Sequence, residues 1–253
     1  MKLNSHPQIG AINEPFSSNH WGEREFTFEA MSTEMRRIFV QYGGRKNHSR
    51  LGYNKCAGFK WMTNQHHNVD PVRMSAWISE SRTKLIFLWR RSLLRQYISN
   101  TVMQSDKTAT TRAHAASYAE AASIANVSVE LTLGDYLVQD LDELVESRSN
   151  IAAHYAALPS MTVYYEDVVE SSERHNKTWS NIIAFLGARR VELPVVTRNL
   201  IIHADKPILA SVRNADAVRS SLREVCSTER GRRYGTSCGE IGWELPQLPL
   251  RRS

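Results

Sequence analysis

The residues best suited to chemistry lie between Lys84 and Ser99, where arginines and serines follow a short apolar run. Arg90 and Arg91 come directly after the apolar run Leu85–Trp89. A guanidinium beside a hydroxyl and a free helix N-terminus suits a phosphate group. The same residues equally suit a solvated corner between a strand and a helix. The local pattern leaves both interpretations open.

Two elements must position these side chains. The apolar run predicts a strand buried on both faces, as in a parallel sheet covered by helices. Ser92 is a suitable N-cap for the helix that follows. In that helix, Leu94 and Ile98 recur at i and i+4 and define an apolar face. Ser92, Arg95 and Ser99 share a different face, so the strand and the helix would bring them beside the two arginines.

Strand and helix patterns alternate along the chain. After a short strand at 9–12, we expect a helix over 28–42 and a strand over 56–62. A helix that begins at Pro71, with Met74, Trp77 and Ile78 as its apolar residues, should lead into the central strand. The helix predicted over 135–158 has one apolar stripe, formed by Leu137, Leu141, Leu144, Ile151 and Tyr155. A helix is also predicted over 171–186, with Gly187 as its C-cap, and another over 214–225. A strand is predicted over 161–165, before Glu166 and Asp167. We expect those two carboxylates to cap the next helix. This βαβ rhythm predicts an α/β domain with a mainly parallel sheet.

Composition limits the classes of partner. The 253 residues include 32 Lys and Arg against 26 Asp and Glu, a net charge of +6. This excess favours an anionic ligand, without choosing among nucleotide, nucleic acid, glycan and membrane surface. The three cysteines form no CxxC pair, so we expect reduced thiols and no structural zinc. No apolar segment has the length of a membrane span, and no signal peptide is visible at the N-terminus.

Lys60 is a separate candidate, because it lies in the otherwise apolar run 56–62. Burying an unpaired charge is costly, so this lysine needs an anionic partner or a route to water. One interpretation places it at a functional site. The other has its stem follow an edge strand while the ammonium group reaches solvent.

Four blocks in order carry a resemblance to a known family. The blocks SHPxI…NEPF, GFKWMxNQ, FLxRRSLLRQYIS and VYYEDV resemble the sulfotransferases, particularly the nodulation-type and plant carbohydrate sulfotransferase-like branch. The similarity extends from about Asn4 to about Leu222. It implies a three-layer α/β domain with a mainly parallel sheet, of the P-loop nucleoside-triphosphate-hydrolase-like type.

The resemblance also implies a function and a cofactor site. Members of the family move a sulfonyl group from 3′-phosphoadenosine 5′-phosphosulfate to a hydroxyl, here that of a carbohydrate, without a metal. By the resemblance, Arg91 and Ser99 hold the 3′-phosphate, since their eight-residue separation matches the family's spacing. Arg90 is a further cofactor residue. So is Arg213, in a segment resembling the one that closes over the nucleotide.

Two catalytic residues follow from the same resemblance. Glu14 falls where glycan sulfotransferases place a carboxylate base, which must reach the acceptor hydroxyl. Lys60 falls near the family's lysine that faces the transferred group, where a cation would stabilise negative charge. The alternative for Glu14 is that it caps the turn that follows it.

The family's first strand and 5′-phosphosulfate loop would precede Asn4, so we expect an N-terminally incomplete gene model. The alternative is a degenerate chain that has lost these parts. We predict one sulfotransferase-like domain over 1–225 and a basic, disordered tail over 226–253. From this chain the default compartment is the cytoplasm. An upstream segment would allow the Golgi lumen or an organelle.

Two other functions stay open at this stage. One is a catalytically inactive sulfotransferase-like protein that keeps only the nucleotide pocket. The other is a basic nucleic-acid binder, which is disfavoured because the arginines are dispersed and no aromatic-rich basic motif is present. A phosphotransferase is less consistent with the sequence, which contains no GxxxxGK[ST] motif.

Overall fold

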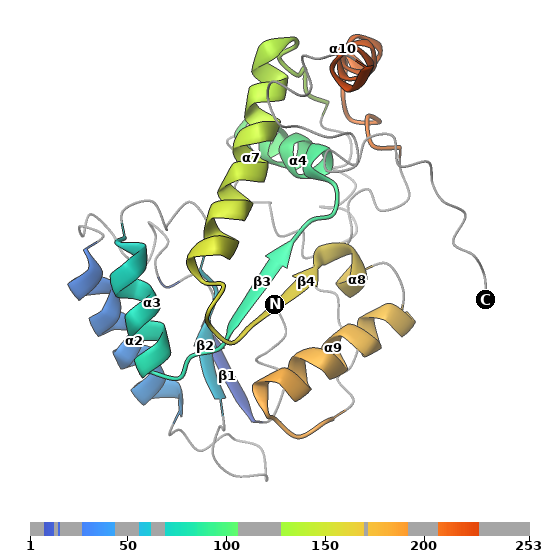
Figure 1. Ribbon diagram of the computed structural model, residues 1–253. Coiled ribbons are helices and arrows are strands. Elements are labelled where there is room, and N and C mark those ends of the chain that lie inside the picture. The colour runs from blue at the N-terminus through green and yellow to red at the C-terminus, as the bar shows by residue number, and fades with distance from the viewer. Residues whose placement is uncertain are drawn as a thin grey trace. The chain divides into compact units, whose positions relative to one another are not determined.

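The computed structural model describes residues 8–12, 15, 27–43, 56–61, 69–105, 128–169, 172–191 and 207–227. Within these ranges, short strands alternate with helices, which makes the protein α/β (Figure 1). The chain forms two compact units. Unit 1 comprises Met1–Phe87, Ile151–Val163 and Ser172–Val196, and unit 2 comprises Leu88–Asn150, Tyr164–Ser171 and Thr197–Ser253.

Unit 1 contains a parallel pair of strands. β1 (Ile9–Ile12) pairs with β2 (Cys56–Phe59), with Ile9 opposite Cys56 and Ile12 opposite Phe59. The helix α2 (Phe28–Gly43) lies between them in sequence. The parallel pairing predicted from the alternation of strands and helices is therefore confirmed for this pair.

Helices α2 and α3 bury the faces that their periodicity predicts. On α2, Met31, Met35 and Ile38 are buried. The second helix, α3 (Pro71–Glu80), begins at the N-cap Asp70, whose carboxylate accepts hydrogen bonds from two backbone N–H groups of the first turn. Its buried residues are the predicted Met74, Trp77 and Ile78.

The end of helix α9 (Ser172–Leu186) is anchored within unit 1. Gly187 follows the helix with φ +72°, a conformation that glycine adopts at low cost and that ends many helices. The Cys56 thiol contacts the Leu186 carbonyl oxygen at 3.3 Å, and the Lys84 ammonium group donates to the Phe185 carbonyl oxygen. Both the helix and its glycine cap match the sequence prediction.

Strands β3 (Leu85–Trp89) and β4 (Ser160–Tyr164) form a second pair. The Leu85 N–H donates to the Pro159 carbonyl oxygen, 3.0 Å away. The bounds of β3 agree with the prediction, but its burial does not. The strand is half-buried and Leu88 is 46% exposed, so the prediction of a strand buried on both faces is wrong. Among the described strands, β3 has only β4 beside it.

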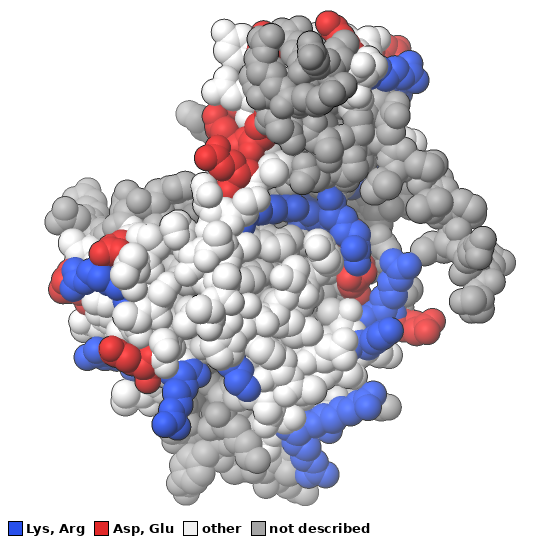
Figure 2. All heavy atoms as spheres, in the orientation of Figure 1, with Lys and Arg blue, Asp and Glu red and all other residues white. Residues whose placement is uncertain are grey.

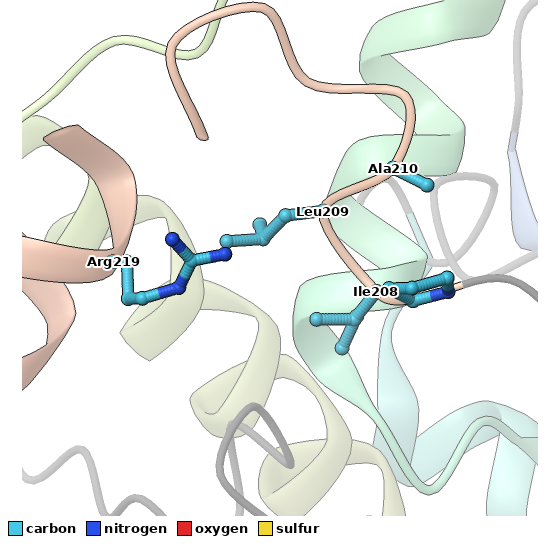
Figure 3. A pocket seen from close by; sticks show the side chains of 5 residues that line it. Ile208, Leu209, Ala210 and Arg219 are labelled. Atoms are coloured by element: carbon cyan, nitrogen blue, oxygen red, sulfur yellow. The ribbon is translucent and has the colours of Figure 1, made fainter. Parts of the chain in front are cut away.

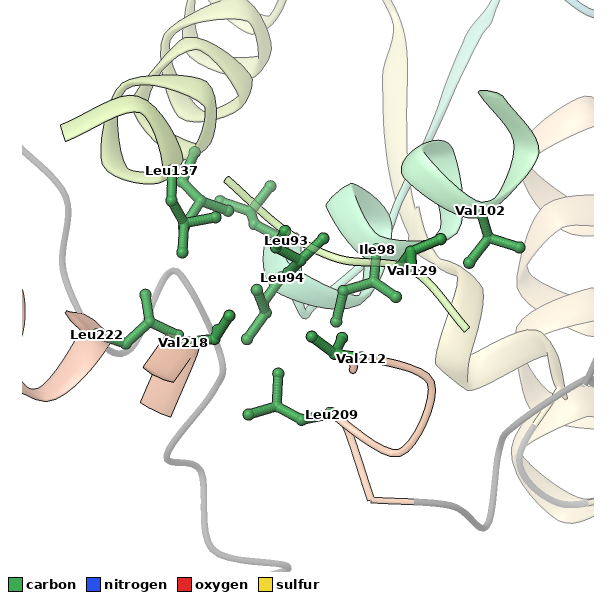
Figure 4. Close-up of a cluster of buried hydrophobic side chains, with 12 residues drawn as sticks. Leu93, Leu94, Ile98, Val102, Val129, Leu137, Leu209, Val212, Val218 and Leu222 are labelled. Carbon is green, nitrogen blue, oxygen red and sulfur yellow. The ribbon is translucent and has the colours of Figure 1, made fainter. Parts of the chain in front are cut away.

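The helices of unit 2 are α4 (Leu93–Ser105), α7 (Asp135–His154), α8 (Tyr165–Val169) and α10 (Ala215–Ser227). Apolar side chains of α4, α7 and α10, with those of the segments 129–131 and 209–212, meet in one cluster (Figure 4). This cluster confirms the apolar face predicted for α4. Its members are Leu93, Leu94, Ile98, Val102, Val129, Leu131, Leu137, Leu141, Leu209, Val212, Val218 and Leu222.

Some sequence predictions require correction. Helix α7 ends at His154, four residues before the predicted end, and a turn follows it. Cys226 was expected in a disordered tail with a reduced thiol, but it lies in α10 and is disulfide-bonded. Cys56 is a free thiol, as predicted. Ser227 of the predicted tail also lies in α10, and residues 228–253 lie outside the described residues.

The division into a domain over 1–225 and a tail stays a prediction. Within the described ranges, no helix combines the length and the apolar character needed to cross a membrane.

Candidate functional site

The candidate site is the corner where β3 gives way to α4, in unit 2. Arg90, Arg91 and Ser92 connect the two elements. The Ser92 hydroxyl accepts a hydrogen bond from the Arg95 backbone N–H at 3.2 Å, which is the geometry of an N-cap. This contact confirms Ser92 as the cap that begins α4, and it fixes the path of the chain immediately after Arg91.

The Arg91 side chain is held from two directions. Its Nη2 donates to Asp167 Oδ2 at 2.6 Å, and its guanidinium lies 4.2 Å from the centre of the Tyr164 ring. The hydrogen bond to Asp167 raises the pKa of Arg91, so the side chain is firmly cationic. The side chain is still 49% exposed. In the described part of the chain, Asp167 is the only hydrogen-bond acceptor for this guanidinium, which leaves further N–H donors available.

Glu166 holds the backbone of the same residue. The Arg91 N–H donates to Glu166 Oε2 at 3.0 Å. Glu166 and Asp167 lie in the first turn of α8, where carboxylates complement the helix dipole. The sequence predicted that they follow a strand and cap the next helix, and that capping role stays a prediction. The sequence did not predict that both would also bind Arg91.

Two further arginines lie at the corner. The guanidinium of Arg90 lies over the Tyr165 ring at 4.6 Å, and that of Arg148, from α7, lies over the Trp89 ring at 5.5 Å. Arg148 Nη2 donates to the Arg90 carbonyl oxygen at 2.6 Å and to Gln96 Oε1 at 2.9 Å. Burial lowers the pKa of Arg148, while the nearby charge of Glu166 opposes that shift.

The electrostatic balance at the corner is positive. Arg90, Arg91 and Arg148 face two carboxylates, those of Glu166 and Asp167. Basic side chains with acidic neighbours also occur at several places on the face drawn in Figure 2. A single ion pair is therefore unremarkable on this surface. The excess of guanidinium groups at the corner could accommodate one doubly charged phosphate.

Ser99 lies about two turns along α4 from Ser92 and is half-buried. No described contact joins it to Arg91, and no described residue is hydrogen-bonded to its hydroxyl. A phosphate that binds both Arg91 and Ser99 would have to lie over the first two turns of α4. The assignment of Ser99 to the cofactor therefore stays a prediction.

Arg213 is the last of the predicted cofactor residues. Its backbone N–H donates to the Val129 carbonyl oxygen at 2.8 Å, beside a parallel bridge between Val129 and Val212. The neighbouring Asn214 side chain bonds both the N–H and the carbonyl of Leu131, at 3.0 and 2.8 Å. The Arg213 guanidinium is exposed, 3.9 Å from a carboxylate oxygen of Glu130. Within the described residues, no contact joins Arg213 to the arginine corner.

The predicted catalytic residues lie elsewhere in the sequence. Lys60 follows β2, which ends at Phe59, so the prediction that it lies inside a strand is wrong. The residue is half-buried and belongs to unit 1. Glu14 lies outside the described residues. The catalytic roles of both residues therefore stay predictions.

A cavity of about 310 Å³ lies beside the segment 207–210 in unit 2 (Figure 3). Its lining consists of Pro207, Ile208, Leu209, Ala210 and Arg219. The one charged member, Arg219, forms an ion pair with Asp216. Because ligand sites usually combine several convergent polar groups, we assign no ligand to this cavity.

Sequence reasoning missed Arg148, although a signal was present. On α7, the apolar residues at positions 137, 141, 144 and 151 lie on one stripe, which Tyr155 continues in the turn after the helix. Residue 148 lies on the same stripe, since it is four residues after Leu144 and three before Ile151. An arginine at a core-facing position of a helix needs a partner, and here the partners lie at the corner.

No protein-family model, no curated protein and no solved structure matches this chain. Within the described ranges, no group of three or more His, Cys, Asp or Glu side chains could hold a metal ion. The site must therefore be judged on the chemistry of its own residues.

Proposed function

We propose that this protein is a sulfotransferase that binds the 3′-phosphate of 3′-phosphoadenosine 5′-phosphosulfate at the corner between β3 and α4. The proposal joins the sequence resemblance to the arrangement of Arg90, Arg91 and Arg148. It includes the three-layer, P-loop-like fold, of which the parallel pair β1–β2 is a compatible part. The proposed acceptor is a carbohydrate hydroxyl.

The observation that carries the proposal is that the Arg91 side chain is held in place and is still accessible. Its guanidinium is fixed by Asp167 and Tyr164, yet half of its side chain is exposed. A guanidinium that is both held in place and accessible loses little conformational freedom when it binds an anion. The remaining N–H donors suit the paired oxygens of a phosphate.

The proposed chemistry is an in-line transfer. The acceptor oxygen attacks sulfur, its proton passes to the Glu14 carboxylate, and the bond between sulfur and the 5′-phosphate oxygen breaks. The products are a sulfate ester and adenosine 3′,5′-bisphosphate. Lys60 would stabilise the negative charge that develops on the departing oxygen. The Arg91 corner takes no part in bond breaking and serves to hold the nucleotide.

Calorimetric titration with adenosine 3′,5′-bisphosphate tests the binding step. We expect measurable binding by the wild type and its loss in Arg91→Ala, because the principal phosphate ligand is removed. The matched control is Arg73→Ala. Arg73 in unit 1 also forms a 2.6 Å ion pair and lies 4.2 Å from an aromatic ring centre, so its removal should leave binding unchanged. Equal binding by wild type and Arg91→Ala would contradict the assignment.

A sulfonyl-transfer assay separates an enzyme from an inactive nucleotide-binding protein. Transfer to a carbohydrate acceptor that is lost in Lys60→Ala supports catalysis. Nucleotide binding without transfer supports the inactive alternative. Binding to an arbitrary oligonucleotide that weakens steeply with salt, without nucleotide binding, would favour the nucleic-acid alternative instead.

A further inference from the structure

We propose that Arg148 is a positioning residue of the phosphate site, and that it holds the Arg90–Arg91 corner in the form that binds the anion. This inference rests on the proposed function. It assigns a role to a side chain that comes from a different helix and lies 58 residues from Arg90 in sequence.

The contacts of Arg148 join both sides of the corner. One nitrogen, Nη2, donates to the carbonyl oxygen of Arg90 and to the side-chain oxygen of Gln96 in the first turns of α4. Arg90 lies before the helix and Gln96 lies within it. A single guanidinium therefore fixes the end of β3 relative to the start of α4, and Arg91 lies between these two anchored points.

The burial of Arg148 indicates more than a stabilising role. Its Nε is buried and, in the described part of the chain, has no hydrogen-bond partner. Both the buried, unsatisfied donor and the desolvated charge are destabilising. A leucine or methionine at this position of the stripe would pack without either cost. The arginine therefore contributes something that an apolar residue would not, and its contacts are with the corner.

The consequence for ligand binding has a definite direction. The Arg90 carbonyl and the Arg91 N–H belong to the same peptide group. The carbonyl accepts a hydrogen bond from Arg148, and the N–H donates to Glu166. When Arg148 holds the carbonyl side and Glu166 holds the N–H side, the peptide plane cannot rotate freely. The loss of Arg148 frees the peptide and also removes a positive charge near the site. Both effects weaken the binding of an anion.

Calorimetric titration of Arg148→Met and Arg148→Lys with adenosine 3′,5′-bisphosphate and with adenosine 5′-monophosphate tests this role. Methionine keeps the packing against Trp89, and lysine keeps the charge without the planar guanidinium. For both variants we expect the bisphosphate to bind about tenfold more weakly or worse, with the monophosphate unaffected. Arg73→Met is the matched control, and its affinities should equal those of the wild type.

Each alternative outcome is distinguishable. If the wild type itself does not bind the bisphosphate, the proposed function fails and this inference fails with it. If the wild type binds and Arg148→Lys binds equally well, charge alone matters and the positioning role is overturned. Equal losses for both nucleotides would show that Arg148 serves the fold generally.

A second variant guards against misfolding of the Arg148 variants. Gln96→Ala removes one of the two acceptors that orient Arg148 but leaves every charge in place. We expect a smaller loss of affinity in the same direction, about threefold, confined to the bisphosphate. Unchanged affinity in this variant, measured on a folded protein, would overturn the inference.

Discussion

Arg73 and Arg91 each contact one carboxylate and one aromatic ring at the same distances, but the other groups around the two arginines differ. Arg73 in unit 1 lies 2.6 Å from Glu29 and 4.2 Å from the centre of the Phe28 ring. Arg91 in unit 2 lies 2.6 Å from Asp167 and 4.2 Å from the centre of the Tyr164 ring. The two arginine side chains are 50% and 49% exposed.

The differences begin with the carboxylates. Glu29 is 66% exposed, whereas Asp167 is 24% exposed. Arg73 lies within a helix, while Arg91 lies between a strand and a helix, where its backbone N–H binds a second carboxylate. Two more guanidinium groups, from Arg90 and Arg148, lie at the corner.

This comparison shows that the geometry of an ion pair does not by itself indicate a binding site. An exposed pair contributes little to stability, and pairs of this kind are common on protein surfaces. The corner at Arg91 differs because several backbone and side-chain contacts converge on it. Arg73 is for that reason a suitable control for each experiment on Arg91.

The largest expected effect comes from buried side chains on α4, which follows Arg91, and on α3, which contains Arg73. Leu94 and Met74 are fully buried, one in each unit. Leu94→Ala and Met74→Ala should each reduce the free energy of unfolding by about 2–5 kcal/mol, because each leaves a cavity. Urea denaturation measures this loss. Only Leu94→Ala, on the helix that follows Arg91, should also weaken binding of the bisphosphate. An equal loss of binding in Met74→Ala would contradict the claim that the bisphosphate binds at Arg91 and not at Arg73.

An intermediate effect is expected at Tyr97, which ties α4 to α7. Its hydroxyl donates to Asp140 Oδ2 at 2.7 Å, and burial raises the pKa of Tyr97 to about 12. Tyr97→Phe should cost about 1.5–3 kcal/mol at neutral pH, since a hydrogen bond to a charged group is lost. The raised pKa means that the stabilisation is complete below pH 10 and is lost as pH rises toward 12.

Chemical denaturation of Tyr97→Phe and the wild type between pH 8 and about 12 checks this prediction. The two stabilities should converge at the alkaline end. A difference that stays constant over this range would contradict the assignment of the shift to Tyr97.

The smallest effects are expected from the carboxylates of the two pairs. Asp167→Asn should reduce the free energy of unfolding by about 1 kcal/mol, at the upper end for such pairs, because Asp167 is the less exposed carboxylate. Glu29→Gln should have a smaller effect. The hydrogen bond from Arg73 lowers the pKa of Glu29, so its contribution is present above the ordinary value of 4.5 and is lost as pH falls through the lowered pKa.

Thermal denaturation of both variants at neutral and acid pH measures these differences. The deficit of Glu29→Gln should vanish in acid. If Glu29→Gln destabilises the protein more than Asp167→Asn, exposure does not determine the strength of these pairs.

The sequence predicted the elements well where a local pattern determines them. The bounds of β3 are correct because Lys84 and Arg90 enclose five apolar residues. Pro71 and Gly187 mark the start of α3 and the end of α9 through their backbone conformations. The end of α7 was placed too late because Tyr155 continues the apolar stripe and is buried, although it lies in the turn after the helix.

Features that depend on distant parts of the chain were not predictable in this way. An apolar run shows that a strand avoids water but not which elements cover its two faces, which is why the burial of β3 was overestimated. At the candidate site, the sequence identified Arg90 and Arg91, but not the five side chains that hold them. Those partners are Arg148, Tyr164, Tyr165, Glu166 and Asp167, all more than fifty positions away.

The contacts of Asn214 have a consequence for how far strand pairing can extend in unit 2. Val129 and Val212 form a parallel bridge, and the next backbone groups available for pairing belong to Leu131. The Asn214 amide occupies both of these groups, with one donor and one acceptor. The Asn214 side chain therefore takes the place that a further strand residue would occupy, and the strand pairing ends there. With both groups occupied, Leu131 offers no open backbone edge to which a foreign β-strand could add during aggregation.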